Sequence, residues 1–444
     1  MGAAPKPFLV NNRLVLGIAV PMTFAYLSVP LAGLVDTAVI GQLGDAALIG
    51  GIAVGAIILD VIFTTLNFLR SGTTGLVAQA FGAGDRKEEQ AILVRALLIA
   101  LVAGLVIILF QVPVTRLGIV AMDVGPEVAD ATSNYLLVRI WAAPFMLANY
   151  ALVGWALGIG RSFLVLALQT VLTLTNIVLS LLFVLDFGWG ITGVAAASVI
   201  AEMVAFFAFV PVLIPHVSGA QRPSLTRIFD KTGFARLIVV NRDIMIRSFS
   251  VLFAFAFFTR QGAALGAVTL AANSVLMHFF LVAGYFLDGF ANAAEQLVGR
   301  AVGARFPPAF DRAVRLTVVW GFVLALSLAG LYFVAGRTLV DMMTTSQDVR
   351  EAARLYLPWA CLTPLAGVLA FQMDGVFIGA TWSKEMRNMM LASLASFFVL
   401  CFVLVPPFGN HGLWAALLVF LGLRGLTLAW RLPVKRQGME SAAI

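Results

Sequence analysis

The chain is poor in charged residues: Asp, Glu, Lys and Arg make up 11% of its 444 residues, whereas about a quarter is usual in soluble domains. Apolar residues make up 61%, and the mean hydropathy is +0.99. A water-soluble fold of this length has no means of hiding so much apolar surface. The composition therefore excludes an ordinary soluble protein and indicates a protein whose solvent is the lipid bilayer.

Cysteine and histidine are scarce as well, with two and three residues. Cys361 and Cys401 lie inside apolar runs without a paired spacing, so we expect small buried residues rather than a disulfide or metal site. The sequence also lacks a Gly-rich phosphate loop with its lysine, a zinc-ligand spacing and a supported Ser/His/Asp set. We therefore expect no enzyme, no cofactor and no bound metal.

Twelve apolar runs are long enough to cross a bilayer, which takes about 20 residues of helix. They predict an all-α polytopic membrane protein with twelve transmembrane helices, the first of them a spanning helix rather than a cleaved signal. The runs of the first half are Leu14–Ile40, Leu48–Phe68, Ile92–Val112, Tyr135–Leu157, Phe163–Leu185 and Ile191–Leu213. Those of the second half are Ile238–Phe258, Val268–Phe290, Val314–Ala335, Tyr356–Ile378, Met386–Val405 and Leu413–Trp430.

The two halves of the chain are related by an internal repeat. Leu76–Gly84 and Leu297–Arg305 match at five of nine positions at an offset of 221 residues, about half the chain. Six spans is an even number, so both copies insert with the same orientation, as in parallel-repeat transporters. We predict two pseudo-symmetric six-helix lobes, residues 1–214 and 237–444, joined by a polar linker at residues 215–236.

Lys and Arg are unevenly distributed over the connecting segments. If both termini are cytoplasmic, the outer loops hold only Arg116, Arg260, Arg337 and Arg350. Loops rich in Lys and Arg stay inside the cell, so we predict that both termini and the linker are cytoplasmic. The same asymmetry accounts for the net charge of +7. We therefore expect the lipid bilayer as a partner, and no nucleic acid.

Asp36 is the most informative charged residue. It lies near the outer end of the first span, and no Lys or Arg lies within one helical turn of it. A charge at bilayer depth is costly, and burial disfavours the ionised form of a carboxylate. We predict that Asp36 is the proton-coupling residue and is reachable from outside. The alternative is an interfacial aspartate that stays hydrated.

Two prolines, Pro21 and Pro30, lie in the same span as Asp36. Each removes a backbone hydrogen bond, so we predict a bend in the first helix. Prolines also occur in membrane helices for packing alone, and a gating role for this bend therefore stays open.

Four further polar residues within the spans are candidates for a cavity. Asn176 and Ser180 lie four residues apart and share a helix face, while Asp60 and Glu202 lie near the middle of the second and sixth spans. Such side chains either line a cavity that binds a proton or cation, or satisfy one another between packed helices. The sequence alone leaves both interpretations open.

A charge cluster is predicted toward the cytoplasmic end of the spans. It comprises Arg70, Asp288, Glu295, Asp374 and Arg387. Opposite charges at the rim of a membrane usually form ion pairs that hold one conformation. We therefore predict a structural or gating role for this cluster, with direct substrate contact as the alternative.

Several runs, in order between about residues 12 and 430, resemble the multidrug and toxic compound extrusion (MATE) transporters. The run DTAVIG at 36–41 resembles the signature of that family's first helix. Four others resemble its DNA-damage-inducible F branch: NFLRSGTTG at 67–75, NRD at 241–243, LDGFANAAE at 287–295 and DGVFIGAT at 374–381.

The resemblance implies twelve helices in two six-helix lobes, arranged as a V around a central cavity. It implies export of amphipathic, often cationic, small molecules in exchange for protons or sodium. Asp36 corresponds to the family's coupling aspartate, Pro21 to the proline where its first helix bends, and Asn176 to a cavity asparagine. The family often carries an aspartate where this chain has Ser180. This departure favours protons over sodium, unless Asp60 compensates for it.

We therefore predict a proton-coupled multidrug antiporter, a monomer in a bacterial inner membrane, with small organic molecules as substrates. Sodium coupling is one alternative, and a lipid-linked precursor flippase of the same superfamily is another. A flippase is expected to show extra helices or a strongly basic cavity, and neither is visible in the sequence. The intramembrane charges of both halves argue against a scaffold or receptor that transports nothing.

Overall fold

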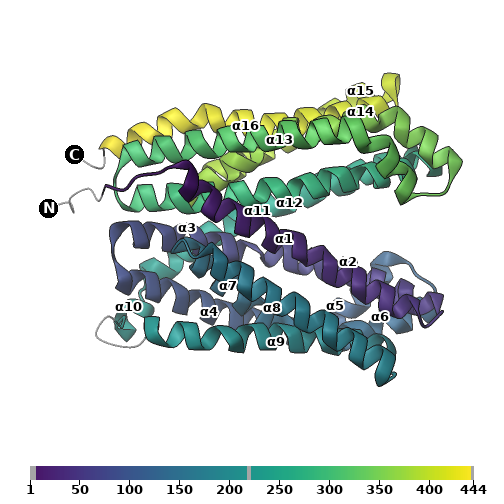
Figure 1. Cartoon of the computed structure of the whole chain (residues 1–444), viewed down its shortest axis with the longest axis horizontal. Helices are drawn as coiled ribbons and strands as arrows, with labels where there is room; N and C mark the ends of the chain where they lie inside the picture. The colour runs from purple at the N-terminus through teal and green to yellow at the C-terminus, as the bar shows by residue number, and fades with distance from the viewer. Residues whose placement is uncertain (1–6, 218–221, 442–444) are drawn as a thin grey trace. The chain divides into compact units, whose positions relative to one another are not determined.

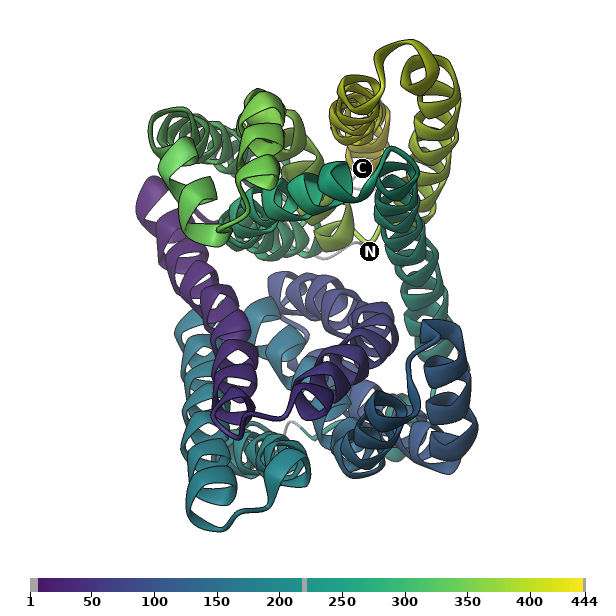
Figure 2. The same ribbon diagram turned by 90° about the vertical axis from the view of Figure 1, so that its right-hand side faces the viewer.

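The computed structural model describes residues 7–217 and 222–441. Within these ranges the chain is helical and contains no strand, and eleven helices are long and apolar enough to cross a membrane. The predicted all-α membrane fold is therefore confirmed. The long helices of each half run alongside one another (Figures 1 and 2).

The helices follow the predicted spans closely. The first half forms α1 (Asn12–Gly41), α2 (Ala46–Leu66), α3 (Phe68–Ala83), α4 (Arg86–Leu109), α5 (Gln111–Met122), α6 (Pro126–Arg139), the turn η1 (Ile140–Ala142), α7 (Ala143–Gly158), α8 (Ser162–Leu181), the turn η2 (Leu182–Asp186) and α9 (Gly190–Val217). The linker holds α10 (Leu225–Ile228). The second half forms α11 (Lys231–Ala264), α12 (Ala267–Gly303), α13 (Pro307–Met343), α14 (Gln347–Gly379), α15 (Ser383–Phe408) and α16 (Asn410–Ser441).

The fourth predicted span is built from two helices, and the second, predicted to end at Phe68, is extended by a further helix. The second runs from α2 into α3 through Asn67, so that Ala46–Ala83 forms an apolar stretch of 38 residues. The fourth is divided into α6 and α7 by the 3₁₀ turn η1. Pro144, at the start of α7, has no N–H to donate to the carbonyl of Ile140, which explains this break.

The helix α11 contains the predicted span Ile238–Phe258. It is not among the eleven helices that are both long and apolar enough to cross a membrane. Its 34 residues are enough to cross a bilayer. Its first half carries charged side chains, which lower its hydropathy: Arg236, Arg242, Asp243 and Arg247. Two of these charges form buried ion pairs, so the protein itself satisfies them.

The connection between α3 and α4 is tight because each helix ends in a specific cap. Gly84 closes α3 with a φ of 71°, a left-handed conformation that glycine adopts without strain. The next residue, Asp85, caps α4 by accepting a hydrogen bond from the backbone N–H of Glu88 at 3.1 Å. Asp85 and Glu88 are thereby presented together at the start of α4.

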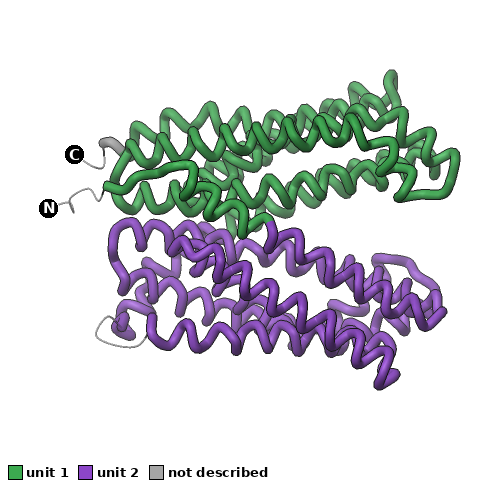
Figure 3. The backbone as a smooth tube through the Cα atoms, in the orientation of Figure 1, with its two compact units in different colours: residues 1–23, 242–444 green, residues 24–241 purple. Residues whose placement is uncertain are grey.

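The chain packs into two compact units, which Figure 3 distinguishes by colour. Unit 2 comprises residues 24–241, and unit 1 comprises residues 1–23 with 242–444. The division runs through α1 and α11, the first helices of the two repeat copies, so each of these helices contributes to both units. The predicted lobes, 1–214 and 237–444, follow the sequence repeat and stay a prediction.

Close helix packing shapes the interior of unit 1. Gly375 and Gly379, four residues apart on α14, lie against backbone carbonyls of α12, where an added Cβ would come within 2.2 Å of an oxygen. Small residues of this kind let membrane helices pack backbone to backbone. Cys361 and Cys401 are free thiols buried in the apolar core of the same unit.

Candidate functional site

Asp36 lies inside unit 2, in the part of α1 that belongs to it. Its side chain is buried, with 7% of the residue's surface exposed. The hydroxyl of Ser180 on α8 donates a hydrogen bond of 2.6 Å to Asp36 Oδ1, and Asn176 is within hydrogen-bonding reach of the same carboxylate. The structure thus brings together three residues that the sequence singled out separately.

Hydrogen bonds continue from Asn176 to the neighbouring helix α9. Asn176 Nδ2 donates to Ser198 Oγ at 2.9 Å, and both side chains are buried. Ser198 lies one turn before Glu202 on α9, so the two share a helix face. Polar groups from α1, α8 and α9 therefore form one connected interior region.

Glu202 is the second buried carboxylate of this region. Asn149 on α7 donates from Nδ2 to Glu202 Oε2 at 2.7 Å and to the backbone oxygen of Glu202 at 3.0 Å. Only 5% of Glu202 is exposed. Its hydrogen-bond partner is a neutral amide, and buried charges in proteins are ordinarily paired with an opposite charge. Glu202 therefore resembles Asp36 in its surroundings.

Arg139, the last residue of α6, is a cation of this region that the sequence reasoning missed. It is close enough to Asp36, Asp60 and Glu202 to interact with each electrostatically. Within residues 7–217 and 222–441, Arg139 forms no direct ion pair with any of them, and its Nη1 is buried without a hydrogen-bond partner. We call Asp36, Asp60, Glu202 and Arg139 the acidic cluster.

The other predicted cavity residue, Asp60, occupies a different setting from Asp36 and Glu202. It lies on α2, and its side chain is exposed. Arg139 is its nearby cation. Asp60 therefore belongs to the acidic cluster because of its charge. It differs from Asp36 and Glu202 because it is exposed and they are buried.

In unit 1, Asp374 on α14 is held between two arginines. Its Oδ2 accepts a hydrogen bond of 2.9 Å from Arg424 Nη2 on α16 and a second from Arg247 Nη2 on α11. Asp374 and Arg424 are both buried, each with 5% of its surface exposed. The ion pairs join three helices of unit 1. Neither arginine was predicted, because each lies within an apolar run.

A second carboxylate of unit 1, Asp243 on α11, pairs with two further arginines. Arg387 Nη1 donates to Asp243 Oδ1 at 2.8 Å, and Arg242 Nη2 donates to the same oxygen at 3.1 Å. Ser383 Oγ donates to Asp243 Oδ2 at 3.1 Å. We call the groups around Asp374 and Asp243 the paired clusters.

The predicted cytoplasmic-side charge cluster is therefore divided among several groups. Asp374 and Arg387 belong to separate paired clusters rather than to one. Asp288 and Glu295 lie on α12, half-buried and buried respectively. Arg70 belongs to unit 2, where it donates to Ser71 Oγ at 2.8 Å. Asp374 and Arg387 are held by ion pairs, and the gating role stays a prediction.

The helix α1 continues as an α-helix through both Pro21 and Pro30. The boundary between the two units falls at residues 23 and 24, between these prolines. The hydrogen bonds that the prolines cannot make are thus absent on both sides of the point where α1 passes from one unit to the other. The predicted bend itself stays a prediction.

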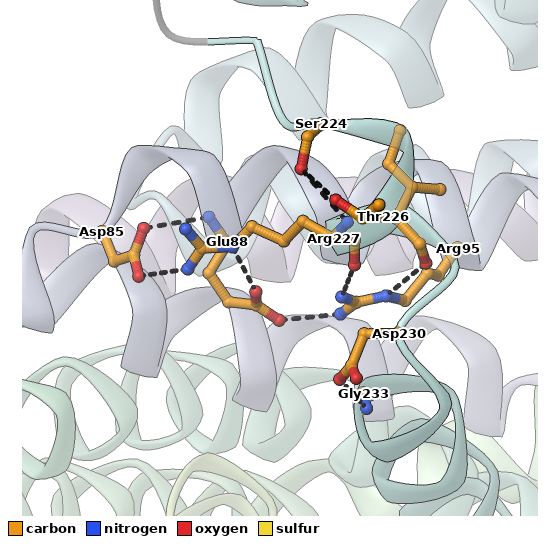
Figure 4. Close-up of polar contacts among 9 residues, drawn as sticks. Asp85, Glu88, Arg95, Ser224, Thr226, Arg227, Asp230 and Gly233 are labelled. Carbon is orange, nitrogen blue, oxygen red and sulfur yellow. Dashed lines mark hydrogen bonds and ion pairs between the residues drawn. The ribbon is translucent and has the colours of Figure 1, made fainter.

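The linker is attached to α4 through Arg227 of α10 (Figure 4). Arg227 Nε donates to Glu88 Oε2 at 3.0 Å, and Arg227 Nη2 pairs with Asp85. Burial lowers the pKa of Arg227, but its hydrogen bonds to Glu88 and Asp85 outweigh this effect and raise the pKa above its ordinary value. Arg227 and Glu88 are about one-third exposed, and 43% of the Asp85 side chain is exposed.

Arg95 of α4 holds the linker from the inside of unit 2. Its guanidinium donates to the backbone oxygens of Arg227 and Ile228, at 2.9 Å for Ile228, and to Glu88 Oε1 at 2.7 Å. Gly233 lies so near that an added Cβ would be 2.6 Å from the Arg95 guanidinium carbon. This contact could not be predicted from local sequence patterns, since 138 residues separate the two positions.

Known proteins resemble this chain along nearly its whole length. The sequence matches the MatE family over residues 21–182 and 244–406, one segment in each half. DNA damage-inducible protein F of Escherichia coli strain K12 is 38% identical over 418 residues, 93% of this chain and 91% of the relative. The probable multidrug resistance protein NorM of Halalkalibacterium halodurans is 22% identical, over 98% and 96% of the two chains.

The fold agrees with these sequence matches. The crystal structure of a MATE protein in its bent conformation covers 97% of this chain and 96% of its own, with a TM-score of 0.89 at 16% identity. Proteins of this family are multidrug efflux transporters rather than enzymes, and they handle small molecules within the membrane. The chain is therefore a multi-pass membrane protein that belongs to the MATE family of transporters, and it is similar in sequence to DNA damage-inducible protein F.

Proposed function

We propose that the chain exports amphipathic, often cationic, small molecules in exchange for protons, and that Asp36 carries the proton. The environment of Asp36 supports this: the carboxylate is buried and is hydrogen-bonded by the neutral side chain of Ser180 at 2.6 Å. A carboxylate in such surroundings is costly to ionise. It is neutralised either by a proton or by an organic cation. Competition between the two for one charge is the basis of exchange.

Protons suit this environment better than sodium. Hard metal cations bind several oxygen ligands, carboxylates foremost among them. Ser180 directs its hydrogen toward Asp36, and position 180 lacks the second carboxylate that the family often carries. A proton requires only one carboxylate oxygen. We therefore infer that the coupling ion is H⁺, and that no cofactor takes part.

We infer an orientation with both termini in the cytoplasm of a bacterial inner membrane, from the excess of Lys and Arg in the inner segments. Asp36 is then near the outer end of α1, where a proton arrives from outside as the substrate leaves. Because α1 contributes to both units, we infer that a change of charge at Asp36 acts on both of them through this helix. We infer that Pro21 and Pro30 allow α1 to bend as the proton binds.

Purified protein in liposomes tests this proposal, with ethidium as the cationic probe. A pH gradient is expected to drive ethidium across the membrane in exchange for protons, and Asp36→Asn is expected to abolish this exchange. Asp45→Asn is the matched control, since Asp45 is an exposed helix cap of the same unit. Exchange at the full rate in Asp36→Asn would contradict the proposal. Exchange driven equally by a sodium gradient at uniform pH would indicate sodium coupling instead.

A further inference from the structure

The register between α2 and α6 determines the surroundings of Arg139. An added Cβ on Gly51 would lie 2.5 Å from the Cβ of Ala131, and one on Gly55 would lie 2.5 Å from the ring of Tyr135. Both contacts join residues 80 positions apart, so the helices run parallel in constant register. One turn further along, this register places Arg139 opposite Leu59, the residue before Asp60.

Two other helices place carboxylates near the same guanidinium. Asp36 of α1 is fixed by its hydrogen bond to Ser180, and Glu202 of α9 is fixed by Asn149. Arg139 interacts electrostatically with both of them. Its half-buried side chain is thus surrounded by acidic groups from three helices without being bound directly to one of them.

The hydrogen bonding of Arg139 is incomplete. Its Nη1 is buried and lacks a hydrogen-bond partner, although a guanidinium has five N–H donors to satisfy. Tyr135, one turn earlier on α6, is its neutral hydrogen-bonding neighbour. A guanidinium with an unused donor, close enough to interact with three carboxylates, is suited to compensate whichever of them is ionised.

The charges of the acidic cluster do not balance. Three carboxylates face one guanidinium, which keeps its charge at every accessible pH. If all three were ionised, two negative charges would remain uncompensated, and two of the three carboxylates, Asp36 and Glu202, are buried where the dielectric constant is low. Arg139 is able to neutralise one carboxylate, and the other two need protons or a cationic substrate.

We propose that Arg139 is the counter-ion of the acidic cluster and sets the pH at which Asp36, Asp60 and Glu202 exchange protons for substrate. Arg139 is thus a positioning residue that acts through the carboxylates. The inference rests on the proposed exchange at Asp36 and identifies the residue that tunes it. Other titratable or charged groups around the cluster are Tyr135 on α6, Tyr150 on α7 and Arg70 on α3.

The direction of the effect follows from electrostatics. A nearby positive charge favours the ionised form of a carboxylate. Without Arg139 the three carboxylates retain their protons to higher pH, so a cation that competes with those protons binds only at higher pH. An opposite charge at close range shifts such an equilibrium by about one pH unit or more. A purely structural arginine would leave the midpoint where it is.

The experiment measures binding of tetraphenylphosphonium to the purified full-length protein between pH 5 and 9, with no gradient applied. In Arg139→Gln the midpoint of binding is expected to move upward by about one pH unit, whereas Arg139→Lys should stay near the wild type. Arg116→Gln is the matched control, because it removes the same charge from an exposed position. Equal midpoints in Arg139→Gln and Arg116→Gln would overturn the proposal.

A second variant keeps the test decisive if Arg139→Gln folds poorly. Arg139→Gln combined with Glu202→Gln removes one positive and one negative charge, and its midpoint is expected to return toward that of the wild type. A midpoint equal to that of Glu202→Gln alone would count against the counter-ion role, because loss of a counter-ion should raise the midpoint above that of Glu202→Gln. Arg139→Gln is also compared with unchanged Arg139 in a protein that carries Asp36→Asn. This comparison measures the effect of Arg139 on Asp60 and Glu202 alone. A shift there supports the inference even if the exchange assay refutes the role of Asp36.

Discussion

The buried carboxylates Asp374 and Asp243 of unit 1 are paired with arginines, whereas the buried carboxylates Asp36 and Glu202 of unit 2 form no direct ion pair within the described residues. In the paired clusters of unit 1, each carboxylate contacts two arginines directly, at up to 3.1 Å. In the acidic cluster of unit 2, three carboxylates share one arginine that contacts none of them directly within the described residues. A compensated carboxylate keeps its charge and holds helices together, whereas an uncompensated one is free to change its charge. The difference points to unit 2 as the place where protons are exchanged.

The internal repeat makes this difference more informative. The two halves share their helix order, but the local offset of 222 residues, which aligns Leu43 and Gly44 with Leu265 and Gly266, places Phe258 of α11 opposite Asp36 of α1. Phe258 is buried in the core of unit 1, with its ring 5.1 Å from that of Trp414 in an edge-to-face contact. An aromatic core residue thus stands where the first copy has a titratable group. The scaffold was duplicated, and the buried carboxylate of Asp36 is present in one copy only of this aligned position.

The largest effect that separates the two units is expected in stability. Asp374→Asn leaves Arg247 and Arg424 without their shared carboxylate, and breaking a buried ion pair in this way costs ~3–5 kcal/mol of unfolding free energy. Glu202→Gln is the counterpart in unit 2. Its new amide still offers an oxygen to Asn149, so a loss of less than ~1 kcal/mol is expected. Denaturant unfolding in detergent micelles measures both variants.

The variants Asp374→Asn and Glu202→Gln also distinguish the two units by the pH dependence of cation binding. Asp374→Asn should leave the pH dependence of tetraphenylphosphonium binding unchanged in the protein that remains folded, whereas Glu202→Gln should move it. Removing one carboxylate makes the cluster less negative, so the remaining groups release their protons at lower pH. The reverse result, with Glu202→Gln costly and Asp374→Asn shifting the pH dependence, would invalidate the distinction between the units.

The smallest effect is expected at the linker. Arg227→Ala removes ion pairs with Asp85 and Glu88 that are partly exposed, and exposed pairs contribute ~0–1 kcal/mol. Salt at 1 M should abolish the difference from the wild type. The pKa of Arg227 is raised, so its stabilising contribution is lost only as the pH rises above that value, outside the range of any transport assay. A loss as large as that of Asp374→Asn would show that the linker attachment is structural.

Most of the fold could be predicted from the sequence, because each span leaves a long apolar run and each run has a counterpart in the repeat. The breaks within spans were less visible. The turn at Ile140–Ala142 depends on one missing N–H at Pro144, which barely alters the hydropathy of its run. The division of α1 and α11 between two units was not predictable, since it depends on tertiary packing rather than on helix length.

The site was predictable in part. Asp36 stands out as a lone acid in an apolar run, and the family resemblance pointed to Asn176. Their common neighbourhood could not be derived from helical periodicity, because the hydrogen bond between Asp36 and Ser180 joins residues 144 positions apart. Arg139 was missed because a single charged residue changes the mean hydropathy of a long apolar run very little. A charged residue inside such a run is itself the signal that would have found it.

The most direct test of the account counts protons as a cation binds. Tetraphenylphosphonium is added to the purified protein in weakly buffered solution near neutral pH, and the change in pH is recorded. The wild-type protein is expected to release protons as the cation binds, and Asp36→Asn is expected to release fewer. Equal release from both proteins would contradict the claim that Asp36 exchanges its proton for substrate.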